Sequence, residues 1–266
     1  MEFTLDEIMD NDLSPRHVSF ISTDNGDVRV FGSGSLVSVG NRAGIITCAH
    51  VHDTILRLKN DPGICLYPPR NKQVQASVLN RNDIRVVRLP SQRVSEGPKG
   101  PDIAFVEAPP SQMDAFRAIG TISDLDRMSA RLEATLPREV QCFRVLSGAI
   151  YADSPDPIRT GEKVVYSPTG RMLPGNVTRI DEDNDLDLGA FSPAFDGDHQ
   201  EPSSYGAASG GGLWRVCLNT HSGKHSVELV GVAFFETDSP NRQIIFHGPN
   251  SIYRVLRARI EDELGQ

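Results

Sequence analysis

Short runs of alternating apolar and polar residues recur along the chain and predict a protein built mainly of β-strands. Two such runs, 17–22 and 28–39, flank an Asn25-Gly26 pair, which is typical of a hairpin turn. Further strands of the first half are expected at 44–47, 74–79, 84–89 and 103–106. A second group is expected at 139–150, 162–166, 175–180, 188–191, 212–218, 227–235 and 243–246. The pattern therefore predicts two sets of roughly six strands each.

Helical patterns occur outside these two strand sets. Residues 112–134 have a helix-forming composition with few turn residues, which predicts a connector. Apolar residues at helical spacing predict a closing helix over about 251–264. We therefore expect a single domain over 1–266. Its parts are a first strand set over about 14–110, a connector over about 111–138, a second strand set over about 139–249 and that helix.

Composition narrows the class of protein. The chain has 266 residues, enough for a core that folds independently, and a net charge of −8 with no basic block, so nucleic acid is not an expected partner. No signal peptide and no membrane-spanning run is visible, so no membrane partner is expected. The four cysteines lie far apart in apolar contexts, which favours buried thiols over disulfides. Together these features predict a cytoplasmic protein.

Two polar residues interrupt the apolar pattern of the first half. His50 follows a Gly-rich strand, and Asp102 stands at the head of the apolar run 103–106. A buried carboxylate needs a partner, and an imidazole N–H is a suitable one. Taken alone, His50 fits a structural histidine and Asp102 fits a turn residue. His52 is expected to point to the other side of the turn.

Ser209 lies in an unusually Gly-rich turn, 206–212. Glycines allow close backbone approach and leave N–H groups free to face a ligand, as an oxyanion-binding site requires. A flexible loop is the simpler interpretation, but the apolar strand 213–216 follows at once and would hold the loop in place. In this chain order, His50, Asp102 and Ser209 supply the base, the orienting carboxylate and the weak nucleophile of a Ser-His-Asp triad.

The segments 32–37 (GSGSLV), 47–50 (TCAH), 102–106 (DIAFV) and 209–211 (SGG) together resemble the trypsin-like serine peptidases, over about residues 17–260. The resemblance is closest to the bacterial, disulfide-free branch that includes the high-temperature-requirement proteases. It implies an all-β chymotrypsin fold of two six-stranded antiparallel β-barrels with a C-terminal α-helix.

The same resemblance implies a role for each site residue. His50 would act as general base and then acid, Asp102 would orient it, and Ser209 would attack the scissile carbonyl. The backbone N–H groups of Ala207 and Ser209 would form the oxyanion hole. Counting back from the nucleophile places Ser203 at the floor of the primary specificity pocket, with Phe234 and Phe235 as further lining. That pocket would favour apolar or small side chains.

The chain departs from this family at Ala207, where glycine is usual. If the position requires a positive φ, alanine costs about 1–2 kcal/mol there. Either Gly206 absorbs the strain or the oxyanion hole stays unformed until something binds. We expect a partly misaligned loop in the resting protein.

We therefore predict a serine endopeptidase that cleaves a protein or peptide substrate through an acyl-enzyme, without metal or organic cofactor. It is expected to be regulated or specific for one dedicated partner. The alternative is a catalytically inert fold that serves as a binding or scaffold module, and Ala207 is the feature that favours it.

Other candidate sites are less convincing. The acidic run 181–187 lacks the glycine and glutamate of a calcium loop, and Gly32-x-Gly34 lacks the third glycine of a dinucleotide site. The histidines of the polar loops have no cysteine or carboxylate cluster at ligand spacing, so zinc is not expected. A nucleophile elbow at Ser209 would need a following helix, whereas the next segment has a strand pattern.

Overall fold

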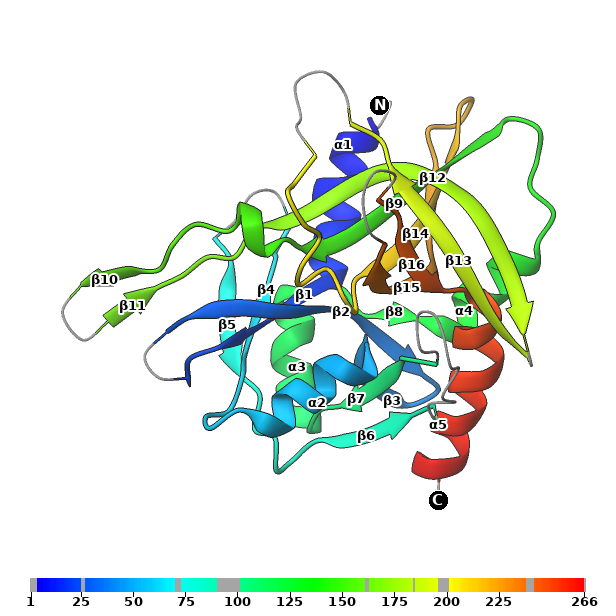
Figure 1. Cartoon of the computed structure of the whole chain (residues 1–266). Helices are drawn as coiled ribbons and strands as arrows, with labels where there is room; N and C mark the ends of the chain where they lie inside the picture. The colour runs from blue at the N-terminus through cyan, green and yellow to red at the C-terminus, as the bar shows by residue number, and fades with distance from the viewer. Residues whose placement is uncertain are drawn as a thin grey trace.

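The alternating residues of the N-terminal half form an antiparallel sheet with the strand order β5-β4-β1-β2-β3-β7-β6 (Figure 1). The strands are β1 (His17–Ser22), β2 (Arg29–Val39), β3 (Arg42–Thr47), β4 (Gly63–Leu66), β5 (Gln75–Val78), β6 (Arg85–Arg88) and β7 (Ala104–Glu107). A two-residue strand, β8 (Ser123–Asp124), pairs with β2 in parallel. This computed structural model describes residues 4–24, 27–69, 73–89, 101–160, 163–183, 185–195, 201–237 and 242–265. The predicted Asn25-Gly26 turn lies outside them.

The C-terminal half forms a closed barrel of antiparallel strands in the order β12-β13-β16-β15-β14-β9. The strands are β9 (Val140–Ala149), β12 (Gly170–Asp183), β13 (Leu186–Pro193), β14 (Gly212–Asn219), β15 (His225–Glu236) and β16 (Ile244–His247). A separate hairpin of β10 (Ile158–Thr160) and β11 (Lys163–Val165) projects from the body (Figure 1). The predicted all-β, two-part architecture with a C-terminal helix is therefore confirmed.

The first sheet differs in two respects from the expected six-stranded barrel. Its path contains an additional strand, β4, which the sequence pattern did not predict, and no pairing between β5 and β6 closes it among the described residues. The side chains of β5 are largely exposed, so its polar pattern fits a sheet edge.

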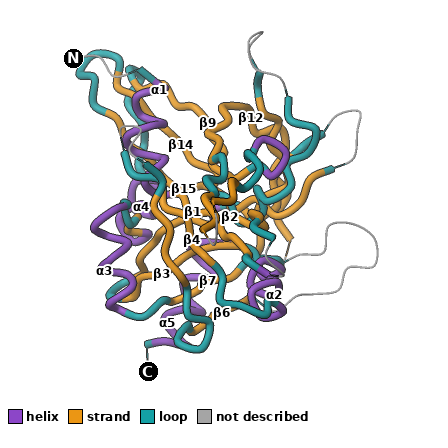
Figure 2. Tube along the Cα trace, turned by 90° about the vertical axis from the view of Figure 1, so that its left-hand side faces the viewer, coloured by secondary structure: helices purple, strands orange, loops and turns teal. Residues whose placement is uncertain are grey.

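Helices lie along the margins of the strand body (Figure 2). They are α1 (Leu5–Ile8), α2 (Ala49–Arg57), α3 (Pro110–Ile119), α4 (Leu125–Glu133) and α5 (Arg257–Leu264), and π-helical turns over Asn250–Leu256 lead into α5. The predicted connector helix is two helices. Gly120 ends α3, and the Asp124 carboxylate accepts a hydrogen bond from the backbone N–H of Arg127 at 3.0 Å, which caps α4.

One hydrophobic core joins the sheet to the barrel. Alternate residues of β14 point to opposite sides, so Leu213 packs inside the barrel whereas Trp214 packs against the sheet in the same cluster as Leu36 and Ile46. The Trp214 indole N–H also donates to Ser147 Oγ at 2.9 Å. The strand that follows the Gly-rich turn is thus held from both sides.

The cysteine prediction is half right. Cys48 and Cys65 are buried free thiols, but Cys142 and Cys217 form a disulfide. Those two residues are direct partners in the register between β9 and β14, which places their side chains on the same face of neighbouring strands. The expected disulfide-free character is therefore wrong, because a pairing register brings together residues that are far apart along the chain.

Candidate active site

The pairing of β3 with β7 brings His50 and Asp102 together. Thr47, the last residue of β3, pairs with Ala104, so the turn into α2 lies beside the residues that lead into β7. The His50 backbone N–H donates to Asp102 Oδ1 at 2.9 Å, and the ring Nδ1 is in hydrogen-bond contact with Asp102 Oδ2. Two contacts from one residue therefore hold the carboxylate against the imidazole.

The environment of Asp102 favours its charged form. Burial by itself raises the pKa of the Asp102 carboxyl, but the hydrogen bonds and charge of His50, with a smaller contribution from His247, lower that pKa below its usual value. An ionised Asp102 accepts the Nδ1–H of His50 and leaves Nε2 as the basic nitrogen. His50 itself is 46 % exposed, so its ring reaches the surface of the site.

His247, at the end of β16, also contacts this pair, although the sequence pattern gave no reason to select it. The Asp102 backbone N–H donates to His247 Nε2 at 2.9 Å, and the His247 ring stacks on Phe234 at 4.4 Å between centroids. His247 is fully buried, and burial lowers its pKa to about 4, so the ring is neutral near pH 7.

Backbone hydrogen bonds position the loop that carries Ser209. The Ser209 carbonyl accepts from the Ser33 N–H at 2.8 Å, and the Gly210 N–H donates to the Ala233 carbonyl at 2.7 Å. The first bond joins the loop to β2 of the sheet, and the second joins it to β15 of the barrel. Ser209 Oγ lies 3.4 Å from the Phe234 carbonyl oxygen and makes no hydrogen bond to His50 within the described structure.

Ala207 adopts a positive φ, the conformation in which alanine is strained at this position. Ala207 has a φ of 74°, and Gly206 is not among the residues with positive φ, so the alanine itself takes the left-handed conformation. Its carbonyl accepts from Ser33 Oγ at 2.7 Å, and Ser33 Oγ accepts in turn from the Ala149 N–H at 2.8 Å. The hydroxyl of Ser33 therefore helps to hold this strained residue in place.

The hydrogen bonds around Ala207 show which N–H groups of the loop have protein partners, and the misalignment of the loop stays a prediction. The Gly206 carbonyl accepts from the Tyr151 N–H at 2.9 Å. Because a trans peptide group is planar, the N–H of Ala207 points away from that carbonyl. In the parts of the chain that the structure describes, the N–H groups of Ala207 and Ser209 donate to no protein atom. Both donors are therefore available to a ligand.

Cys48 adds a thiol to the same region. Its Sγ and ligand atoms of His50 and Asp102 all lie within 4.8 Å of one another, a grouping that a metal ion could use. However, burial and, to a lesser extent, the charge of Asp102 raise the pKa of the Cys48 thiol, and Cys48 Sγ–H donates to the Ala233 carbonyl at 3.0 Å. Metal binding requires a thiolate, so this donor set is poorly suited to a metal.

A hollow of about 230 Å³ opens beside Ser209. Phe234 and Phe235 line it as the sequence predicts, together with Tyr205 and Glu236. Ser203 is not part of its lining: it is exposed, and its carbonyl accepts from Arg242 at 2.6 Å. Counting back from the nucleophile therefore selected a residue outside the lining of this hollow.

Glu236 carries the one carboxylate of this hollow, and other groups already compensate its charge. Glu236 Oε2 accepts from the Tyr205 N–H at 2.9 Å and from Ser204 Oγ at 3.0 Å. Glu236 Oε1 lies 3.4 Å from the Arg242 guanidinium. The polar bonds to Glu236 therefore order the wall of the hollow.

His52, two residues after His50, takes no part in this arrangement. It is buried, makes no hydrogen bond to Asp102 or Ser209, and its Nδ1 has no partner among the described residues. Burial lowers its pKa.

No protein-family model matches the chain, and no curated protein matches it. Among solved structures, an inactive form of Rv3671c from M. tuberculosis H37Rv with a serine-to-alanine substitution is 14% identical, with a TM-score of 0.45. The match covers 94% of this chain and 89% of that one. The tobacco vein mottling virus protease is 10% identical with a TM-score of 0.41, over 94% and 82% of the two chains. These similarities are remote, and we base the fold on the strand order and pairing described above.

None of the described helices has the combination of length and apolar character that crossing a membrane would require.

Proposed function

We propose that the protein is a serine endopeptidase with His50, Asp102 and Ser209 as its catalytic triad. The observation that carries this proposal is the His50–Asp102 pair, held by two hydrogen bonds beside a Gly-rich loop that presents Ser209 and two unpaired N–H groups. Base, orienting carboxylate, nucleophile and oxyanion donors are the parts that acyl transfer requires. The trypsin-like character of the fold is consistent with this chemistry.

The geometry suggests how each group would act. Asp102 holds the Nδ1–H tautomer of His50, so Nε2 can accept the proton of Ser209 Oγ while that oxygen attacks the scissile carbonyl. The N–H groups of Ala207 and Ser209 would donate to the oxyanion. His50 would then protonate the leaving amine, and water would hydrolyse the acyl-enzyme by the same route.

The resting contact of Ser209 supports a regulated or partner-specific enzyme. Ser209 Oγ lies against the Phe234 carbonyl, so it must turn from that oxygen toward His50 before the proton can be transferred. Binding of the substrate beside Phe234 would displace this contact. The peptidase would then become competent as its substrate binds.

The hollow beside Ser209 suggests the specificity. Its aromatic lining and limited volume suit an apolar side chain, and Glu236 is already bonded to Tyr205, Ser204 and Arg242. A cationic side chain would therefore gain little from Glu236. We propose cleavage after apolar residues in a protein or peptide substrate.

A degenerate peptide library with mass spectrometry of the products tests this function. The expected products are fragments that end in apolar residues and are absent when Ser209→Ala replaces the wild type. Ser203→Ala is the matched control, because it is an exposed serine outside the hollow. Products identical in the Ser209→Ala protein would refute the proposal, and a folded wild type that cleaves no peptide would favour a scaffold module.

A further inference from the structure

The closed barrel contains a second, larger hollow, whose lining does not include Ser209. β14 leaves the Ser209 loop at Gly212 and lines this hollow with Leu213 and Arg215, whereas β9 lines it with Arg144 and runs back to Ala149 beside Ser33. Its volume is about 650 Å³. Small-molecule sites typically measure roughly 300–1,000 Å³ and often lie in the mouths of β-barrels.

The floor of this hollow is apolar. Leu213, Val230 and Phe246 line it, are nearly inaccessible to solvent and belong to the hydrophobic cluster inside the barrel. Tyr253 covers one side, and its hydroxyl donates to the Leu229 carbonyl at 2.6 Å. Small barrels usually fill their interior with side chains, but here the space above this layer is left open.

A row of charged residues crosses three strands above the floor. Arg144 directly faces Arg215 between β9 and β14, and Arg215 directly faces Glu228 between β14 and β15. Arg215 pairs with the buried Glu228 at 3.2 Å. Arg144 has no carboxylate within ion-pair distance among the described residues, and its nearest acceptor is the Phe143 carbonyl at 3.5 Å. The row therefore carries one uncompensated positive charge.

The positive charge of Arg144 is destabilised by its surroundings. Arg144 is partly buried, and like charges at directly opposed strand positions repel each other. Burial and, to a lesser extent, the neighbouring Arg215 lower the pKa of the Arg144 guanidinium, and the smaller opposing effect of the Glu228 charge does not cancel them. A bound anion would offset both the desolvation and the repulsion.

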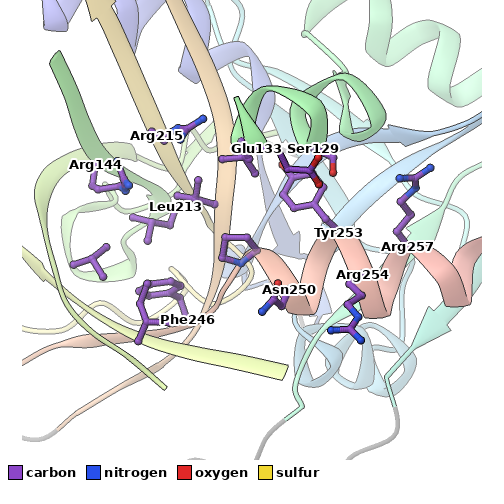
Figure 3. Close-up of a pocket in the computed structure, with 15 residues that line it drawn as sticks. Ser129, Glu133, Arg144, Leu213, Arg215, Phe246, Asn250, Tyr253, Arg254 and Arg257 are labelled. Carbon is purple, nitrogen blue, oxygen red and sulfur yellow. The ribbon is translucent and has the colours of Figure 1, made fainter. Parts of the chain in front are cut away.

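The other charged residues of the hollow are already paired or exposed. Figure 3 shows Arg144 and Arg215 at one end, beside Leu213 and Phe246, and Arg254 and Arg257 at the other, with Tyr253 between the two pairs of arginines. Arg254 pairs with Asp185 at 3.0 Å, and Arg257 pairs with Asp126 at 2.9 Å. Glu133 is exposed. Among the described arginines that line the hollow, Arg144 is therefore the one whose charge no carboxylate pairs with, and we expect an anion to bind at its end.

We propose that this hollow binds a small aliphatic carboxylate. The carboxylate bonds to the fork of the Arg144 guanidinium, and the hydrocarbon chain lies on Leu213, Val230 and Phe246. An anionic head suits the unpaired arginine, and an apolar body suits the floor. The site is separate from the peptidase chemistry and does not depend on it.

Isothermal titration calorimetry of the full chain with octanoate tests the proposal. We expect one octanoate to bind per chain, and octan-1-ol and acetate to bind at least about ten-fold more weakly, because each lacks one half of the ligand. Decanoate should bind roughly ten-fold more tightly than octanoate, since it buries two more methylene groups. Absence of octanoate binding, or equal affinity for octan-1-ol, would overturn the proposal.

Two arginine variants locate the head group. Arg144→Gln should weaken octanoate binding at least about ten-fold. Arg254→Gln is the matched control, because it removes the same charge from the other end of the hollow, where Asp185 already pairs with it. Its affinity should remain within about two-fold of the wild type. Equal affinity of Arg144→Gln and wild type, with circular dichroism showing both folded, would refute the assigned contact.

Discussion

The two sides of the proposed active site are held in different ways. On the sheet side, every contact of the pair uses a polar side chain: the Asp102 carboxylate contacts the backbone and the ring of His50, and His247, from β16 of the barrel, accepts from the Asp102 backbone N–H. On the barrel side, the Ser209 loop is held mainly through its backbone, and both Ala207 and Gly210 have positive φ. On the sheet side, activity should therefore be most sensitive to substitutions that change a polar group. On the barrel side, stability and activity should be most sensitive to substitutions that add atoms to the loop or remove a hydrogen bond that holds its backbone.

The sharpest test of the sheet side is Asp102→Asn. The amide cannot stabilise the imidazolium and favours the wrong tautomer of His50, so kcat should fall roughly 10⁴-fold while the free energy of unfolding changes little. Steady-state kinetics on a peptide from the library measures this effect. A loss below about ten-fold would show that Asp102 does not orient the base.

The corresponding test of the barrel side is Gly210→Ala. Gly210 has a φ of 88°, and an added Cβ would lie 2.0 Å from the Ser33 carbonyl oxygen. We expect a loss of about 3 kcal/mol in the free energy of unfolding, from steric overlap together with the left-handed conformation. Activity should fall roughly 10²–10³-fold as the oxyanion donors move. Gly40→Ala is the control, because it has positive φ but open space around it.

Acid should destabilise the fold through its buried histidines, of which His17 and His247 have the largest downward pKa shifts and His52 a smaller one. Burial lowers the pKa of His17 to about 3 and that of His247 to about 4. These folded-state values lie below the unfolded value, so the stabilisation is complete above about pH 6.5 and is lost as pH falls toward 4. Each histidine should cost roughly 1.4 kcal/mol per pH unit in that window. Urea unfolding measured from pH 7 to pH 4.5 checks the slope.

The matching variant for this pH dependence is His17→Phe. It removes one titrating group that is remote from Asp102, so the slope should fall by roughly 1.4 kcal/mol per pH unit. An unchanged slope would mean that His17 is protonated in the folded protein.

The Ser33→Ala variant tests whether the Ser33 hydroxyl holds the Ser209 loop in place. Ser33 Oγ donates to the Ala207 carbonyl and accepts from the Ala149 N–H, so its loss leaves two backbone groups without partners. We expect roughly 1–3 kcal/mol lower stability and a fall in kcat with little change in KM. Ser35→Ala is the control on the same strand, because Ser35 Oγ is buried without a hydrogen-bond partner. Equal kinetics for the two variants would contradict the anchoring role.

The smallest effect is expected for Ala207→Gly. Glycine adopts a φ of 74° without steric cost, so the free energy of unfolding should rise by about 0.5–1 kcal/mol, net of the greater chain entropy of glycine. Chemical denaturation measures this change. A destabilised Ala207→Gly protein would show that the alanine methyl group packs favourably enough to outweigh its backbone strain.

The sequence was most informative for site residues that lie at the end of a recognisable strand. His50 and Asp102 could be selected because each interrupts an apolar run, and the pairing of β3 with β7 brings them together. The strands of the closed barrel could likewise be predicted from their alternation, whereas the barrel itself was expected from the family resemblance.

Features that depend on contacts distant along the chain could not be predicted. The Cys142–Cys217 disulfide depends on the register between β9 and β14, and the role of His247 depends on where β16 meets the loop before β7. Tyr205 and Glu236 replace Ser203 in the hollow because the loop before Ser209 does not follow the expected spacing. Each of these misses concerns a partner that no local pattern specifies.

The central claim is that His50 and Asp102 activate Ser209. Reaction of the folded protein with a fluorophosphonate, followed by mass spectrometry of the peptide adducts, tests it most directly. We predict a single adduct on Ser209 that forms in the wild type and is lost in His50→Ala. Absence of an adduct on Ser209, or an equal rate of labelling in His50→Ala, would contradict the account.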